Sequence, residues 1–261
     1  MLPVVTIFNL EIGVYLACAV IGLFLAVAVA YVRLLRLGRP VAVVRLGIAL
    51  TILAGFGTMV AVNLAINAWR EFQAGGPLPP ESYEGMSVLW ALAGGMVAGV
   101  AICRWQRAPV LQVFDLAILG APLGQAVGRL GCWAAGCCYG KETEHWLGIH
   151  APDDAGHWED RYPTQLISAA ANLAIFFVLV VVERRSYRSD GTRQPWAFDG
   201  MLTLLYVALF AAKRFSIALL RDSGAPLLGP FNWMQLSALL AIAAVALLWG
   251  WRRREISIVN G

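Results

Sequence analysis

Seven long apolar segments constrain this chain more than any other feature of its sequence. Each approaches the ~20 residues that an α-helix needs to cross the hydrocarbon of a bilayer. They fall at residues 12–32, 43–66, 86–103, 113–136, 166–182, 200–220 and 233–250. Hydrophobic residues make up 59% of the chain and charged residues only 14%, whereas about a quarter of the residues in a soluble domain are charged. The sequence therefore predicts an all-α, polytopic membrane protein with seven transmembrane helices.

The basic residues between these segments alternate from one side of the membrane to the other. Four alternate connections carry thirteen of the 20 lysines and arginines: Arg33, Arg36, Arg39, Arg45, Arg104, Arg107, Arg184, Arg185, Arg188, Arg193, Arg252, Arg253 and Arg254. Cytoplasmic loops are enriched in such residues, so we expect the N-terminus outside and the C-terminus inside. The net charge of +4 then reflects arginines that face an anionic inner leaflet, and we expect no nucleic-acid partner.

The organisation of the chain is simple. No lysine or arginine precedes Arg33, so the first apolar segment lacks the basic region of a cleaved signal peptide, and we expect it to remain as a helix. No repeat of 20 to 50 residues and no low-complexity segment is visible. We therefore expect residues 1–261 to form a single integral-membrane domain.

The segment from residue 115 to 140 carries a stripe of small residues with one charge inside it. Gly120, Gly124 and Gly128 recur at every fourth position, a spacing that lets membrane helices approach closely. Arg129 follows in the same apolar run. An arginine is always charged and is costly to bury in a membrane without a partner, so Arg129 is a candidate functional residue. The alternative is an arginine that reaches the interface or binds backbone carbonyls of a neighbouring helix.

A second apolar segment, at residues 200–220, also carries basic residues. Lys213 and Arg214 lie in its outer half, and Arg221 follows Arg214 by one heptad, which places both arginines on nearly the same helix face. Two helices thus bring arginines to one depth near the outer surface. Guanidinium groups suit phosphate, and a phosphate at this depth indicates a phospholipid headgroup.

Three cysteines and three histidines cluster after Arg129: Cys132, Cys137, Cys138, His145, His150 and His157. Their spacing matches no recognised ligand pattern, because it contains neither a CxxC pair nor an HExxH motif. A metal site, an outward-facing disulfide or redox role, and plain helix packing all stay open for the cysteines. Packing is favoured, since free cysteine behaves as a small hydrophobe. We therefore expect no metal and no cofactor.

Several of these stretches together resemble one protein family. QVFDLAILGAPLGQAVGRLG at residues 112–131, YPTQL at 162–166 and RFSIALLR at 214–221, followed by a terminal RRR, are similar to segments of the bacterial prolipoprotein diacylglyceryl transferases. The resemblance runs in order over roughly residues 84–250. Its most specific parts are the glycine–arginine motif at residues 128–131 and the pair formed by Arg214 and Arg221.

The resemblance implies a function and a set of site residues. Such enzymes move the diacylglyceryl group of phosphatidylglycerol to a cysteine thiol of a lipoprotein precursor, in the bacterial inner (cytoplasmic) membrane. The implied partners are thus a phospholipid, a precursor peptide and the membrane itself. Arg129 and Arg214 would be the catalytic residues that hold the phosphate. The substrate-binding residues would be Gly128, Gly131, Arg221, Ser87, Gln165 and Gly140.

The chain departs from the family pattern at several positions where the resemblance implies other residues. It has Leu89, Cys132, Cys137 and Ala218 in place of a histidine or tyrosine, an asparagine and two glutamates, and a further glutamate after the PTQL motif is missing at Ser168 and Ala169. Two other functions therefore stay open. One is a phospholipid-binding paralogue without catalysis, and the other is a thiol redox membrane protein that uses its cysteines.

Overall fold

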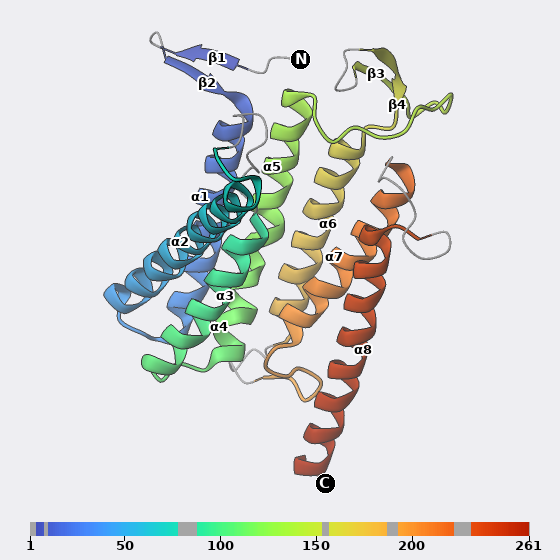
Figure 1. Cartoon of the computed structure of the whole chain (residues 1–261). Coiled ribbons are helices and arrows are strands. Elements are labelled where there is room, and N and C mark those ends of the chain that lie inside the picture. The colour runs from blue at the N-terminus through green and yellow to red at the C-terminus, as the bar shows by residue number, and fades with distance from the viewer. Residues whose placement is uncertain are drawn as a thin grey trace. The chain divides into compact units, whose positions relative to one another are not determined.

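The computed structural model is mostly helical and describes residues 4–7, 10–77, 88–152, 157–186, 193–221 and 231–260 (Figure 1). The α-helices are α1 (Val14–Leu34), α2 (Val41–Ala74), α3 (Val88–Trp105), α4 (Val110–Ala117), α5 (Ala121–Ala135), α6 (Thr164–Arg185), α7 (Met201–Leu220) and α8 (Trp233–Asn260). Two short 3-10 helices, η1 (Leu35–Leu37) and η3 (Ile118–Gly120), continue α1 and join α4 to α5.

Six helical segments within the described residues are long and apolar enough to cross a membrane. They are Val14–Leu37, Val41–Ala74, Val110–Ala135, Thr164–Arg185, Met201–Leu220 and Trp233–Arg254. The expected span at 86–103 corresponds to α3, whose apolar part, Trp90–Trp105, is shorter than these six. The prediction of a polytopic, largely helical membrane protein is therefore confirmed, and many large apolar side chains on these helices are exposed for contact with lipid.

Two short antiparallel hairpins add strands that the all-helical prediction did not include. β1 (Val4–Ile7) pairs with β2 (Leu10–Gly13) immediately before α1, and β3 (Ile149–Pro152) pairs with β4 (Trp158–Arg161) between α5 and α6. The helix expected at 113–136 is also subdivided into α4, η3 and α5. The 3-10 turn lies directly before α5, and Pro122 occupies the first turn of that helix, where its missing N–H leaves no hydrogen bond unmade.

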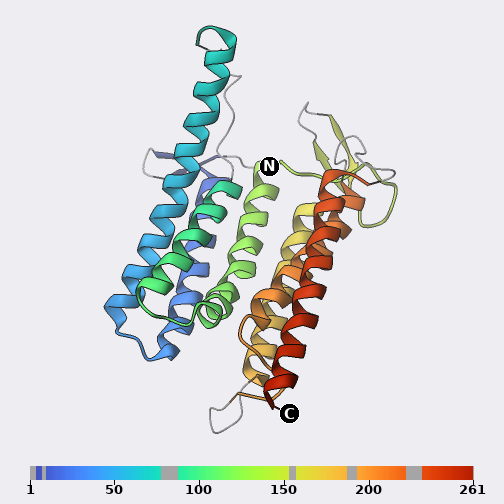
Figure 2. The same ribbon diagram turned by 60° about the horizontal axis from the view of Figure 1, so that its bottom comes forward.

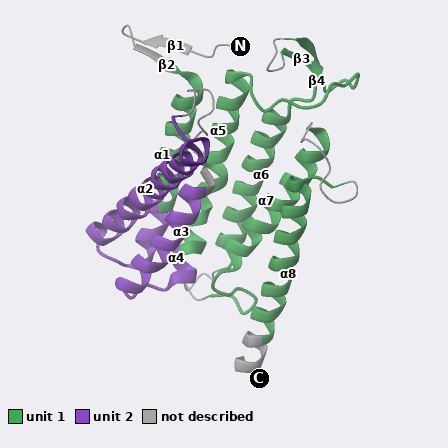
Figure 3. Ribbon diagram, viewed as in Figure 1, with its two compact units in different colours: residues 1–30, 114–261 green, residues 31–113 purple. Residues whose placement is uncertain are grey.

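The chain divides into two compact units (Figure 3): unit 1 holds residues 1–30 and 114–261, and unit 2 holds residues 31–113. In unit 2, α2 packs on α3 through small residues. A Cβ added to Gly55 would lie 2.7 Å from the carbonyl oxygen of Ala91, and one on Gly94 would meet the side chain of Thr58. This close approach of two helices is the packing that small residues permit in membranes.

In unit 1, α6, α7 and α8 run beside one another in both views, and α5 packs on α6 (Figures 1 and 2). The core between them is formed by Leu119, Ile175, Leu179, Phe198, Met201, Leu202 and Tyr206. The first part of α1 approaches the 115–140 segment through glycine, as expected. A Cβ on Gly120 would lie 2.1 Å from the carbonyl oxygen of Ala26, and one on Gly124 would lie 2.5 Å from that of Gly22.

Candidate functional site

The end of α5 forms a tight turn that carries two of the cysteines. Gly136 closes the helix in the left-handed conformation, with a φ of 76°, and its N–H donates to carbonyls of the last turn. This is the usual way in which a glycine ends a helix. Cys138 then also adopts a positive φ, 64°, which is uncommon for a residue with a side chain. The chain thus reverses within a few residues after Cys132 and returns toward it.

The first two residues of α6 hold this turn in place. The hydroxyl of Thr164 donates to the carbonyl of Cys138 at 2.7 Å, and the side-chain amide of Gln165 donates to the carbonyl of Cys137 at 2.8 Å. Both side chains are buried. Each hydrogen bond joins residues 26 or 28 positions apart, so the end of α5 is fixed to the start of α6.

The turn brings three thiols together. The sulfur atoms of Cys132, Cys137 and Cys138 all lie within 4.8 Å of one another. A hydrogen bond from the thiol of Cys132, helped by the charges of Arg221 and Arg129, holds the pKa of Cys138 below that of an ordinary cysteine, although burial opposes it. Burial raises the pKa of Cys137. Cys138 is therefore the member of the cluster that ionises first.

Four basic residues lie together beside the thiols, and we call them the basic group: Arg129, Lys213, Arg214 and Arg221. The charge of Arg129 acts on Lys213 and Arg214, and that of Arg221 acts on Arg214. Arg129 also acts on Cys132 and Cys138, which places the basic group next to the thiol cluster. Arg129 and Arg214 are half-buried.

Lys213 is positioned by its own contacts. Its ammonium donates to Oδ1 of the buried Asn172 at 2.7 Å and lies 4.3 Å from the ring centroid of Phe210. Within the described ranges, no carboxylate forms an ion pair with Lys213, Arg129 or Arg214. Like charges held together without a counter-ion are costly in a poorly hydrated site. Arg129, Lys213 and Arg214 are therefore suited to an anion, and the guanidinium forks of the two arginines fit a phosphate.

The glycines that the resemblance assigned to substrate binding fall into two kinds. A Cβ on Gly128 would meet nothing within 4 Å, so the helix surface next to Arg129 is open there. Gly131 instead packs on α1, where a Cβ would lie 2.7 Å from that of Cys18. Gly140 is wedged against Tyr162 and the carbonyl oxygen of Leu220, with added-Cβ distances of 2.5 to 2.9 Å. Gly131 and Gly140 thus permit close packing.

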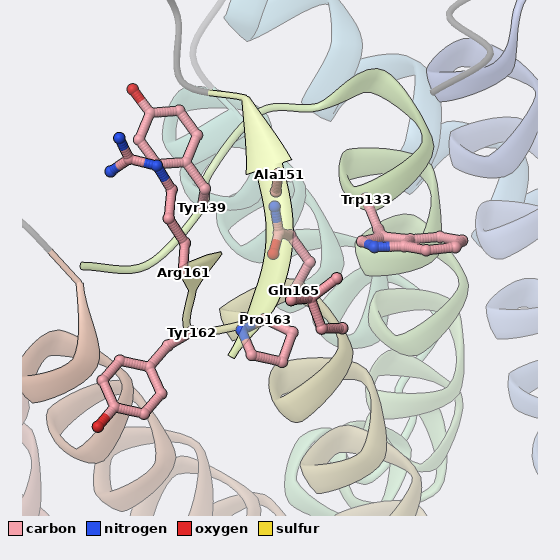
Figure 4. Close-up of a pocket in the computed structure, with 8 residues that line it drawn as sticks. Trp133, Tyr139, Ala151, Arg161, Tyr162, Pro163 and Gln165 are labelled. Atoms are coloured by element: carbon pink, nitrogen blue, oxygen red, sulfur yellow. The ribbon is translucent and has the colours of Figure 1, made fainter. Parts of the chain in front are cut away.

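Two further expectations concern Ser87 and Gln165. Ser87 lies outside the described residues. Gln165 contacts the cysteine turn and also lines a small hollow with Trp133, Tyr139, Ile149, Ala151, Arg161, Tyr162 and Pro163 (Figure 4). Arg161 in this hollow is buried, with its guanidinium 2.9 Å from Glu142 and over the ring of Tyr139. The hollow is lined by residues of the β3–β4 hairpin, of α5 and of the start of α6, and neither Arg129 nor Arg214 lines it.

The histidines of the 141–165 loop do not join the thiols. Nδ1 of His150 lies 3.1 Å from Asp160 on the exposed hairpin, and Nδ1 of His145 accepts a hydrogen bond from the N–H of Leu147. In the part of the chain that the structure describes, the only group of three potential metal ligands found close together consists of cysteines alone. Sequence spacing did not indicate this cluster, nor the roles of Thr164 and Asn172. The one usable signal was that polar residues inside apolar helices tend to be functional.

Comparison with known proteins gives the family of this chain. The family model for prolipoprotein diacylglyceryl transferase matches residues 3–251. The chain belongs to this family. The resemblance drawn from residues 112–131, 162–166 and 214–221 is thereby confirmed.

Individual relatives are distant in sequence. A phosphatidylglycerol–prolipoprotein diacylglyceryl transferase 2 of Clostridium perfringens is 29% identical over 171 residues, which cover 63% of this chain and 61% of the relative. A Dehalococcoides mccartyi transferase is 28% identical over 193 residues, 73% of this chain and 70% of the relative. One from Campylobacter hominis is 32% identical over 140 residues, 53% and 45% of the two chains. The chain thus spans about three-fifths of the first of these transferases.

Proposed function

We propose that this member of the prolipoprotein diacylglyceryl transferase family moves a diacylglyceryl group from a phosphatidylglycerol-like phospholipid to a cysteine thiol of a lipoprotein precursor. One observation carries the proposal: Arg129, Lys213 and Arg214 lie together without a paired carboxylate among the described residues. The names of the related transferases point to the same two substrates.

The proposed reaction develops negative charge on the phosphate, which the basic residues can stabilise. The acceptor sulfur bonds to the terminal glyceryl carbon, the bond from that carbon to the phosphate oxygen breaks, and the phosphate leaves with the electron pair. The thiol proton leaves as well. Negative charge therefore grows on the departing oxygen, and fixed cationic donors stabilise that charge better than water does. We assign phosphate binding to Arg129 and Arg214, with Lys213 and Arg221 adding charge.

The other assigned residues act differently from the arginines. The open surface at Gly128 leaves room for a lipid chain or headgroup beside Arg129. Gln165 acts through the carbonyl of Cys137, so we assign it to positioning of the cysteine turn. Gly131 and Gly140 support the site through packing, and Ser87 remains a substrate-binding residue by resemblance alone.

We further propose a topology in which the chain crosses the bacterial inner membrane seven times as a single domain. In this arrangement α3 crosses the membrane in addition to the six longer spans. The N-terminus lies outside, and the basic group lies in the outer half of the bilayer. The thirteen arginines on one set of connections support this topology. Reporter fusions after Arg254 test it: a reporter that is active only in the periplasm contradicts the proposed orientation.

The decisive test of the function is transfer of labelled diacylglyceryl from phosphatidylglycerol to a lipobox peptide by the purified chain. We expect Arg129→Ala and Arg214→Ala each to lower the rate by on the order of 10² to 10³, as loss of one oxyanion donor does. Arg185→Ala is the matched control, because Arg185 is exposed at the far end of α6. Transfer that survives both arginine substitutions contradicts the proposal. A chain that binds the lipid through these arginines but never transfers it is the non-catalytic paralogue.

A further inference from the structure

The three thiols beside the basic group form a cluster that the proposed transfer reaction does not itself require. Their sulfur atoms lie within 4.8 Å of one another. Zinc–sulfur bonds are about 2.3 Å long, so thiolates that share one tetrahedral ion lie about 3.8 Å apart. Modest side-chain rotation would therefore bring Cys132, Cys137 and Cys138 onto one ion. Three ligands from one short segment leave one position of a tetrahedral ion free.

The backbone that presents these thiols is already fixed. Cys132 belongs to the last turn of α5, and Gly136 with its positive φ reverses the chain behind it. Thr164 and Gln165 hold the carbonyls of Cys138 and Cys137 from α6. Folding thus already fixes the backbone of the ligands, so binding of an ion would order little more than their side chains.

Charge also favours a bound ion. A helix C-terminus carries partial negative charge, and the cluster lies at that end of α5. Three thiolates around a divalent ion leave one net negative charge, which Arg129 and Arg221 offset because their charges already act on Cys138. Sulfur-only ligands select a thiophilic ion of the zinc class over calcium or magnesium.

We propose that Cys132, Cys137 and Cys138 bind a thiophilic divalent ion of the zinc class through three thiolates, with the fourth position open toward the basic group. Three protein ligands with one open position is the pattern of catalytic zinc sites, whereas structural zinc sites are closed by four.

The open position has a natural occupant, and this step rests on the proposed function. A thiol that coordinates such an ion loses its proton outright. The acceptor cysteine of a precursor peptide would bind as thiolate and release its proton to solvent. Its sulfur would then attack the glyceryl carbon while the phosphate, held by the basic group, leaves with the electron pair of the broken carbon–oxygen bond. The thioether product is a weaker ligand than thiolate and leaves the ion. The site thus supplies thiol activation that Leu89 cannot.

Cobalt(II) is the probe for the site. The full chain is purified in detergent, reduced, freed of metal and titrated with cobalt(II), whose thiolate complexes absorb in the near ultraviolet. We expect one equivalent to bind, with a charge-transfer band that zinc(II) abolishes. Each of Cys132→Ser, Cys137→Ser and Cys138→Ser should weaken the band, while the matched control Cys103→Ala, in α3 of unit 2, retains it. Circular dichroism confirms that each variant is folded.

Thr164→Val provides a variant that keeps all three thiols. Loss of such a supporting hydrogen bond lowers metal affinity on the order of 10- to 100-fold, so the cobalt dissociation constant should rise by that factor. No charge-transfer band in the reduced wild-type chain overturns the site. A disulfide within the cluster, found by mass spectrometry of chain isolated from membranes, also overturns it and favours the thiol redox function.

A lipobox peptide tests the open position separately. Adding the cysteine peptide should change the cobalt spectrum, and the same peptide with serine should not. A spectrum that neither peptide changes overturns the coordination of the acceptor. If the chain transfers lipid at full rate without binding cobalt or zinc, the metal site fails and the proposed function stands. If it binds metal but transfers nothing, the proposed function fails and the site stands.

Discussion

The carboxylate of Asp115 accepts a hydrogen bond from the backbone N–H of Gly200 at 2.8 Å, across 85 residues of sequence. Its other oxygen accepts from the N–H and the hydroxyl of Thr203, each at 2.9 Å. Asp115, in α4, thus caps the start of α7, and its negative charge complements the positive end of that helix. Asp115 is only 3% exposed, so these hydrogen bonds are shielded from solvent.

Asp115→Ala should therefore destabilise the protein without touching the basic group. Each buried donor left unpaired costs about 1–3 kcal/mol. The unfolding midpoint in detergent should fall clearly, and Asp115→Asn, which keeps one acceptor oxygen, should fall less. Glu159→Ala on the exposed strand β4 is the control and should change the midpoint little. Equal midpoints for Asp115→Ala and the control would show that the cap contributes nothing.

The glycines of the 115–140 segment allow folding and function to be separated. Gly124→Leu places side-chain atoms into the backbone of Gly22 and should reduce the amount of folded protein in the membrane. Gly128→Leu meets open space and should leave folding intact. Because the added side chain fills the surface beside Arg129, its transfer rate should still drop. Gel filtration and the transfer assay distinguish the two effects, and a misfolded Gly128→Leu chain would remove the open surface from the proposal.

Alkylation of the metal-free chain tests the electrostatics of the thiols. The pKa of Cys138 is lowered, so Cys138 is already thiolate at neutral pH and its rate with iodoacetamide should fall only in acid. The pKa of Cys137 is raised, so its rate should still increase in alkali. Arg221→Gln should shift the Cys138 profile to higher pH, while Arg185→Gln should not. Peptide mass spectrometry measures the alkylation of each cysteine as a function of pH. The same pH dependence for both cysteines would contradict this assignment.

Lys213 should contribute to anion binding with less weight than the arginines. A charge-assisted hydrogen bond is worth about 1.5–3 kcal/mol, so Lys213→Met should weaken inhibition by free glycerol phosphate about 10- to 100-fold. The methionine keeps most of the apolar contact with Phe210. Unchanged inhibition in this variant would place Lys213 outside the phosphate site and leave it as a partner of Asn172 alone.

Hydropathy and the glycine spacing predicted much of the fold, because membrane helices must satisfy their backbone internally and small residues mark close contacts. Gly120 and Gly124 bear this out, whereas Gly128 continues the stripe but faces open space. The break at η3 and the strand pairs escaped prediction, because such short elements depend on tertiary contacts and leave little periodicity.

The arginines of the candidate site were visible in the sequence, and the thiol cluster was not. A charged residue inside an apolar segment indicates a functional site whatever the fold. Arg129 and Arg214 could therefore be identified from the sequence alone. The approach of Cys132 to Cys138 instead depends on two residues with a left-handed φ, Gly136 and Cys138. Cysteine gives no hint that it will adopt such a conformation, and its spacing alone favoured helix packing.

The backbone near Gly140 sets the relation between Arg221 and the thiols. The N–H of Lys141 donates to the carbonyl of Leu220, and the N–H of Gly140 donates to that of Tyr162. These bonds tie the cysteine turn to the residue before Arg221 through main-chain atoms alone. Changing the side chain of Lys141 would leave these main-chain bonds in place, but one residue inserted between Cys138 and Gly140 would shift the register by about 3.8 Å. The length of this turn therefore helps to set how the sulfur atoms face the guanidinium group.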